Sequence, residues 1–205
     1  MEIQYKLQQE FQLKAAQVEN VIKLIDEGNT IPFIARYRKE MTGSLDDQIL
    51  RSLSERLSYL RNLEEKREQV KNIITEQGNM TEEIAQKLSI AQTMTEIEDI
   101  YRPFRPKRRT RATIAKEKGL EPLADLIWIQ KLSDTLEHMA QPFLDTEKGV
   151  QTIEEAIAGA KDILAERISD NADFRKLLRT EIIKNGFLTA KATDDTKQSV
   201  YEMYY

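Results

Sequence analysis

Apolar residues recur at spacings of three and four along most of the chain. Val18, Val21, Ile22 and Ile25 follow this spacing, and residues 49–60 repeat it. Such spacing places apolar side chains on one face of an α-helix, whereas a half-buried strand alternates apolar and polar residues. Sustained alternation of the strand type is absent from the sequence. The pattern therefore predicts an all-α, multi-helix bundle.

Glycines and prolines are few enough to mark the breaks between helices. Gly28 and Asn29 follow two apolar-periodic stretches, residues 3–11 and 14–27, and glycine and asparagine commonly end helices. We expect a helix-turn-helix-like element here, although two adjacent helices are far commoner than a DNA-reading motif and both interpretations stay open. Pro32 suits the first turn of a further short helix.

That short helix completes the first predicted domain, residues 1–43. Gly43 is expected to end it. Three residues form its expected apolar side: Phe33, Ile34 and Tyr37.

A long helix is predicted over residues 45–77, with Ser44 as its N-cap and Asp47 in its first turn. At about 1.5 Å per residue it would be roughly 50 Å long, which suits a spine for other elements. Thr81 and Thr95 are expected to cap two shorter helices, the second as a T-x-x-E box with Glu98.

Further helices are predicted up to Gly186, so residues 44–186 form the second predicted domain. Thr152 and Glu155 make a capping box for one helix, and Asp170 is expected to cap the last one. Residues 187–205 lose the helical periodicity, and we expect this segment to be a truncated connection to further domains.

The composition excludes several kinds of site and a membrane-spanning protein. The chain has no cysteine, which excludes disulfides, thiolate zinc sites and cysteine nucleophiles. No apolar run approaches the roughly 20 residues that span a bilayer, so we expect a cytoplasmic protein with no membrane partner.

Charge is distributed unevenly along the chain. The net charge is −4, but residues 101–118 carry eight basic residues against the single acidic Glu117, which leaves −11 for the remainder. We call residues 101–119, YRPFRPKRRTRATIAKEKG, the basic segment. An acidic body with one concentrated basic segment offers a polyanion one place to dock.

The basic segment is a candidate nucleic-acid contact. Pro103 and Pro106 are expected to hold it extended, and Tyr101 and Phe104 could add stacking surface. If about six cations each neutralised a phosphate of a single strand, log affinity would fall against log salt with a slope of about −4. The candidate phosphate ligands are Arg102, Arg105, Lys107, Arg108, Arg109 and Arg111.

A rival interpretation of the same residues is internal docking. Arginines also bind helix carboxyl ends and acidic patches of their own protein, and the aromatic residues could belong to the core. A smaller cluster beside Tyr37 has the same two interpretations: Arg36, Arg38 and Lys39.

No residue pattern indicates catalysis. His138 is the single histidine, and no nucleophile or metal ligand has a recognisable spacing to it. Neighbouring acidic pairs such as Asp46–Asp47 point about 100° apart on a helix, which makes a poor metal site. Phosphate-loop and hydrolase motifs are absent. We therefore predict no enzymatic activity, no metal and no cofactor.

Three strings of the sequence together resemble one protein family. They are EGNTIPFIARYRKEMTGSLDDQ (27–48), TEIEDIYRPFRPKRRTRATIAKEKGLEPLAD (95–125) and GAKDILAERISDNADFRKLLR (159–179). In register, they resemble the N-terminal region of the bacterial transcription accessory protein Tex. One departure is Arg102-Pro103-Phe104, where the family more often has an aliphatic residue, proline and tyrosine.

The resemblance implies a longer protein with a resolvase-like domain, helix-hairpin-helix elements and a C-terminal oligonucleotide-binding barrel. In the family, that barrel chiefly binds nucleic acid, single-stranded RNA or DNA, and the N-terminal helices pack with a later part of the chain. The expected function is thus a helical scaffold that positions downstream modules and adds phosphate contacts. The alternative is a protein-interaction module that contacts the transcription machinery, with the basic segment on an acidic protein surface.

Overall fold

The computed structural model describes residues 3–106, 108–130, 134–194 and 200–204, and helices make up most of these ranges. Within those ranges the one extended pairing is an isolated bridge between Asp145 and Val150. The all-α prediction is confirmed. Two compact units divide the chain, residues 1–97 and 98–205, so the predicted boundary between residues 43 and 44 lies inside the first unit.

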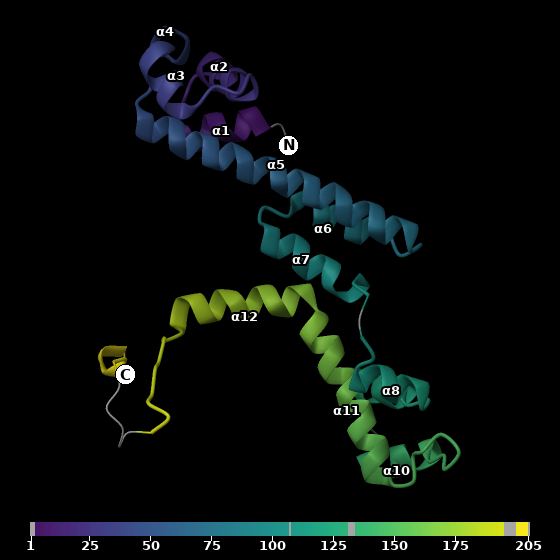
Figure 1. The fold of residues 1–205 in the computed structure, drawn as a ribbon. Helices are drawn as coiled ribbons and strands as arrows, with labels where there is room; N and C mark the ends of the chain where they lie inside the picture. Colours follow the sequence, from purple (N-terminus) through teal and green to yellow (C-terminus); the bar gives the residue numbers. More distant parts are fainter. Residues whose placement is uncertain (1–2, 107, 131–133, 195–199, 205) are drawn as a thin grey trace. The chain divides into compact units, whose positions relative to one another are not determined.

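The first unit begins with two helices, α1 (Ile3–Phe11) and α2 (Ala15–Asp26), which pack against each other and against α5 (Asp47–Glu76). Figure 1 shows them over the N-terminal half of α5. Their fully buried side chains, Leu7, Val18 and Val21, form the core of this part. The predicted two-helix element is present, with Gly28 in the left-handed conformation after it.

The short helix predicted after Pro32 is two helices, α3 (Ile31–Tyr37) and α4 (Lys39–Thr42). Arg38 lies between them with φ −127° and ψ 25°, outside the helical region. Gly43 ends α4 with φ 68°, as predicted. Tyr37 does not join the apolar side: Ile34 is fully buried, whereas the side chain of Tyr37 is 65% exposed.

The long helix α5 is confirmed, but its N-cap is Asp46, whose carboxylate accepts a hydrogen bond from the Ile49 amide at 2.8 Å. Ser44, the predicted cap, has φ 63° and precedes the helix. Along α5 a row of buried residues faces α1 and α3 first and α6 (Glu82–Ile90) further on.

Helix α7 (Met94–Tyr101) crosses the boundary between the units. It begins one residue before Thr95, and Thr93 takes the role predicted for Thr95 by accepting from the Glu96 amide at 3.2 Å. The helix ends at Tyr101 as expected from Pro103, but Arg102–Phe104 then form a 3₁₀ turn, η1, rather than extended chain.

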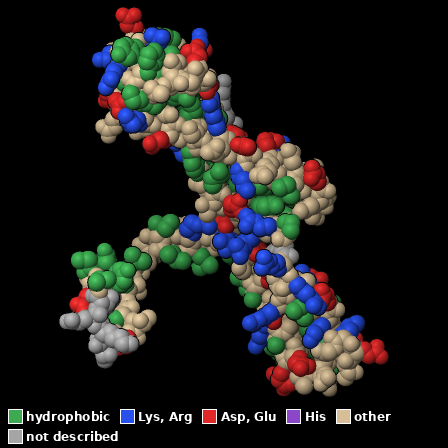
Figure 2. All heavy atoms as spheres, viewed as in Figure 1, with side chains coloured by type: hydrophobic (Ala, Val, Ile, Leu, Met, Phe, Trp, Pro, Cys, Tyr) green, Lys and Arg blue, Asp and Glu red, His purple; other side chains and the backbone are tan. Residues whose placement is uncertain are grey.

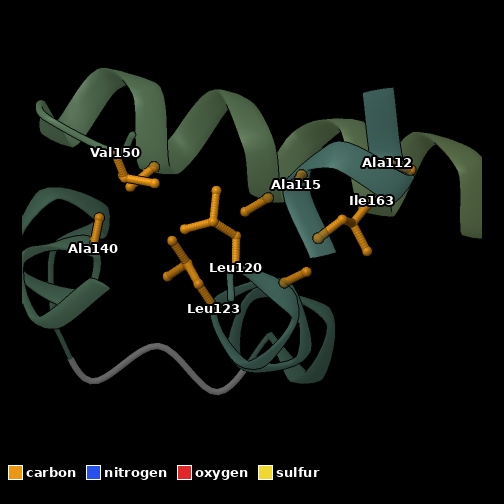
Figure 3. Packing of buried hydrophobic residues seen from close by; sticks show 10 residues of the cluster. Ala112, Ala115, Leu120, Leu123, Ala140, Val150 and Ile163 are labelled. Atoms are coloured by element: carbon orange, nitrogen blue, oxygen red, sulfur yellow. The ribbon is translucent and has the colours of Figure 1, made fainter. Parts of the chain in front are cut away.

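The second unit has a core of small and branched residues between α11 (Ile153–Asp170) and three shorter helices, α8 (Arg111–Glu117), α9 (Glu121–Ile129) and α10 (Leu136–Ala140). Figure 3 shows Leu120 and Leu123 pointing into this core. The 3₁₀ turn η2 (Gln141–Phe143) follows α10. A Cβ on Gly159 of α11 would lie 2.3 Å from Leu120 Cδ1, so glycine allows the close approach.

Helix α12 (Ala172–Asn185) has Asn171 as its N-cap, because the Asn171 carboxamide accepts from the Phe174 amide at 2.9 Å. Asp170, the predicted cap, instead ends α11. No residue of α12 is buried, and Figure 2 shows hydrophobic side chains along it. Its most exposed ones are Leu177, Leu178, Ile182 and Ile183. A short 3₁₀ turn, η3, spans Glu202–Tyr204.

None of the helices in the described ranges combines the length and apolar character that a bilayer crossing requires.

Candidate nucleic-acid interface

The first two arginines of the basic segment are placed by the turn that follows α7. The Arg102 Nε donates to Asp170 at the end of α11 over 2.9 Å, and the Arg105 guanidinium pairs with Glu98 on α7. Their side chains remain 45% and 52% exposed. Figure 2 shows Lys and Arg side chains gathered in this region.

The middle of the basic segment is fixed by the start of α8. The Thr110 hydroxyl accepts from the Thr113 amide at 3.1 Å and lies 2.8 Å from a carboxylate oxygen of Glu166 on α11. Beside it, Arg109 donates to Glu117 at 2.6 Å, yet its side chain is 67% exposed. The backbone is thus anchored while the guanidinium group stays in solvent.

Arg108 and Arg111 are exposed, and neither has an ion-pair partner among the residues that the structure describes. Arg111 lines a hollow of about 240 Å³ between α8 and α11, together with Lys118 and Asp162. Lys107, the other predicted phosphate ligand here, lies outside the described residues. Arg108 and Arg111 thus give the basic segment two cations that no described carboxylate neutralises.

The two predicted stacking residues have little surface to offer. Tyr101 is 9% exposed and the Arg105 guanidinium lies 5.4 Å from its ring centroid. Phe104 is half-buried. For Tyr101 the core interpretation therefore holds, because its ring is covered and its face is already occupied by a cation.

An acidic anchor that the sequence reasoning missed lies next to the basic segment. Asp99 on α7 is 5% exposed and accepts from Arg175 at 2.6 Å and from Arg179 at 2.7 Å, both on α12. Burial opposes ionisation of Asp99, but the two arginine hydrogen bonds outweigh it and hold the pKa of this carboxyl below its ordinary value. The sequence did contain a signal for this anchor: Arg175 and Arg179 are four residues apart, and this spacing puts both side chains on one helix face, where they can share one carboxylate.

The second predicted cluster lies in the first unit. Arg36, Arg38 and Lys39 are all exposed, around a hollow of about 480 Å³ that residues 36–41 line. The Arg38 guanidinium is 5.1 Å from the Phe33 ring centroid. The structure thus brings these three cations together, and it adds Tyr37, whose exposure the sequence reasoning missed.

The remaining polar candidates of the sequence are His138 and the neighbouring acidic pairs. His138 is exposed and pairs with Asp134, one turn earlier on the chain. In the part of the chain that the structure describes, no three His, Asp or Glu side chains are grouped closely enough to hold a metal ion. Asp195, which follows Asp194 in another acidic pair of the sequence, lies outside that part.

Comparison with known protein families gives two matches within the chain. Residues 1–75 match the family described as Tex-like protein N-terminal domain, and residues 131–205 match the family described as Tex central region-like. Together they frame the basic segment on both sides.

Similar proteins occur in bacteria and in animals. The chain is 46% identical over 189 residues to the protein tex of Bordetella pertussis, and 40% identical over 206 residues to the transcriptional accessory protein Tex of Neisseria gonorrhoeae. These alignments cover 92% and 98% of the chain. A human protein named S1 RNA-binding domain-containing protein 1 is 30% identical over 161 residues, 78% of the chain.

The chain is much shorter than these relatives. It spans 24% of the Bordetella protein, 27% of the Neisseria protein and 16% of the human protein.

Proposed function

The chain belongs to the Tex family, in which it corresponds to the N-terminal region of a transcription accessory protein, and from this premise we propose that it is a helical scaffold that supports nucleic-acid binding. Its basic segment contributes auxiliary phosphate contacts to RNA or DNA, and regions outside the chain provide the main binding surface. The role is positioning and electrostatic attraction, with no reaction of its own.

The observation that carries the proposal is the exposure of the basic segment's arginines, including the paired ones. An exposed ion pair contributes only about 0 to 1 kcal/mol, so a phosphate can take the place of a carboxylate at little cost. Arg102 pairs through Nε, and Arg109 through one Nη. Each guanidinium has five N–H donors, which leaves further donors for phosphate oxygens.

The names of relatives support the same role. The human relative is named for an S1 RNA-binding domain, and the bacterial relatives for Tex. From these names the proposal takes only the class of ligand, which is nucleic acid.

The test changes the two arginines that lack a described carboxylate partner. Fluorescently labelled single-stranded RNA and duplex DNA are titrated into the 205-residue chain at about 50 mM salt, with and without Arg108→Gln/Arg111→Gln. Each lost phosphate contact on a single strand lowers the salt slope by about 0.7, so we expect affinity for RNA to fall about 10- to 100-fold and the slope to flatten by about 1.4.

A matched control removes the same charge elsewhere. Arg51 and Arg61 on α5 have side chains 56% and 44% exposed, and each pairs with a carboxylate. Arg51→Gln/Arg61→Gln should leave affinity within about twofold, since it removes no phosphate contact. Equal affinities for the wild type and the Arg108/Arg111 variant would remove the basic segment from the proposal.

A second candidate function is a protein-interaction module for the transcription machinery, and one observation favours it. The apolar face of α12 is largely exposed, with Leu178 at 58% and Ile182 at 66%. Contiguous exposed apolar surface is typical of protein contact sites rather than of phosphate-binding sites. In this case purified RNA polymerase would bind the chain, and Leu178→Glu/Ile182→Glu would prevent it without changing RNA affinity.

A further inference from the structure

Tyr37 presents an aromatic ring to solvent at the end of α3. Its side chain is 65% exposed. The ring lies 5.2 Å from that of Phe33, centroid to centroid, at an interplanar angle of 46°. This tilted contact, one helical turn away, orients the Tyr37 ring without covering it.

Positive charge surrounds this ring. Arg36 and Lys39 are exposed and have no ion-pair partner among the described side chains. Arg38 lies over Phe33, 5.1 Å from the ring centroid, and donates through Nη1 to the Tyr37 carbonyl at 3.2 Å. The exposed Glu40 is the one acidic side chain that lines the hollow. Three cations against one carboxylate leave a local charge that favours an anion.

Buried residues and hydrogen bonds from α2 fix the backbone that carries these side chains. Ile34 and Thr42 are fully buried, and the Thr42 hydroxyl hydrogen-bonds the Arg38 carbonyl at 3.3 Å. From α2, Gln17 donates to the Thr42 carbonyl at 3.1 Å and Asn20 donates to the Met41 carbonyl at 2.8 Å. Helices α2 and α4 pack against each other, as Figure 1 shows. The backbone that carries the ring and the cations is therefore held in place before any ligand binds, which reduces the backbone entropy lost on binding.

We propose that Tyr37 stacks on an unpaired base of single-stranded nucleic acid, while Arg36, Arg38 and Lys39 contact the phosphates on either side of it. An aromatic face beside cations is how proteins bind single strands without sequence preference. A duplex is a poor ligand for this surface, because its bases are stacked on each other and only its phosphates could be reached. The hollow of about 480 Å³ is within the size range of small-ligand sites.

This inference rests on the proposed function, since it takes the chain to bind nucleic acid. It adds the chemistry of the ligand, an unstacked base, and a contact place in the first unit.

The test separates base stacking from phosphate contact. Two probes of equal charge are compared on the 205-residue chain: an oligothymidylate of about 12 nucleotides, and the same backbone with abasic residues. Stacking of one base on one ring should make the wild type prefer the base-bearing strand by about 5- to 150-fold. Tyr37→Ala should remove that preference and leave the abasic affinity and the salt slope unchanged, whereas Tyr37→Phe should retain it.

Tyr5 provides the matched control. Its side chain on α1 is 58% exposed, close to the 65% of Tyr37, but it lies outside the basic cluster. Tyr5→Ala should keep the full preference. Far-UV circular dichroism of each variant verifies that the helices are retained.

Two results would overturn the inference. In the first, Tyr37→Ala keeps the preference for the base-bearing strand; in the second, it lowers the affinity for both strands equally. If Arg108→Gln/Arg111→Gln still lowers affinity in the same assay, the proposed function stands and only the stacking contact is lost. If neither variant changes binding, both proposals are wrong.

Discussion

At the scale of single residues, Asp99 links α7 to α12, and neither helix contributes a residue to the apolar core of the second unit. Helix α12 has no buried residue, so little hydrophobic burial holds it in place. Its Arg175 and Arg179 instead share the carboxylate of Asp99, whose side chain is 7% exposed. A charge-assisted hydrogen bond with so little solvent contributes more than an exposed pair does.

The linkage between protonation and folding gives a prediction for Asp99→Asn. The folded-state pKa of Asp99 lies below its ordinary 3.8, so its contribution to stability is complete above that value and disappears as the pH falls through the lower folded-state pKa. At pH 7 the variant should lose about 2 kcal/mol of unfolding free energy. Urea unfolding, followed by fluorescence of Trp128 in the same unit, measures this loss.

The control for that experiment is to repeat the comparison of wild type and Asp99→Asn at lower pH. As the pH falls below 3.8 and through the lower folded-state pKa of Asp99, the stabilising contribution of its carboxylate is lost, so the difference between wild type and Asp99→Asn should shrink. A difference that stays constant from pH 7 to pH 2 would show that the variant acts through packing rather than through the charge.

At the scale of helices, three N-caps lie one or two residues from the predicted ones. Asp46 replaces Ser44 at α5, Thr93 replaces Thr95 at α7, and Asn171 replaces Asp170 at α12. In each case the sequence offers neighbouring residues that can all cap a helix. The choice depends on where the incoming chain allows an extended φ and ψ, and that is a property of the fold.

The α5 cap can be tested with a pair of variants. Asp46→Ala removes the hydrogen bond to the Ile49 amide and should lower the unfolding free energy by about 1 kcal/mol. Ser44→Gly should raise it by about 1 kcal/mol, because Ser44 has a φ of 63° that glycine adopts without steric cost. Thermal unfolding followed by far-UV circular dichroism gives both values. A stabilising Asp46→Ala would contradict the cap assignment.

At the scale of the whole molecule, the chain has two compact units, each with its own buried core. Leu53 of α5 and Leu123 of α9 are both fully buried, one in each unit. Replacing either by alanine removes the same side chain and should cost about 2 to 5 kcal/mol in its own unit. Trp128, the single tryptophan, lies in the second unit and reports on that unit alone.

The expected outcome distinguishes the two variants. Leu123→Ala should lower the urea midpoint seen by Trp128 fluorescence. Leu53→Ala should leave that midpoint unchanged while lowering part of the transition seen by far-UV circular dichroism. Identical shifts of both signals in both variants would mean that the units unfold as one.

The sequence by itself determined the helical class, most helix positions and the concentration of charge in residues 101–119. These properties are local: a spacing of three and four, a glycine that adopts positive φ at Gly43, and a run of arginines need no distant partner to be recognised. The same local information could not show that the predicted short helix breaks at Arg38.

Tertiary structure alone decided which side chains are exposed to solvent and which contact each other. Tyr101 and Tyr37 are both aromatic residues beside arginines in the sequence, yet one is 9% and the other 65% exposed. Asp99 meets Arg175 and Arg179 across more than 70 residues of chain. Burial and long-range pairing depend on how helices pack, and a one-dimensional pattern of residue types does not specify that packing.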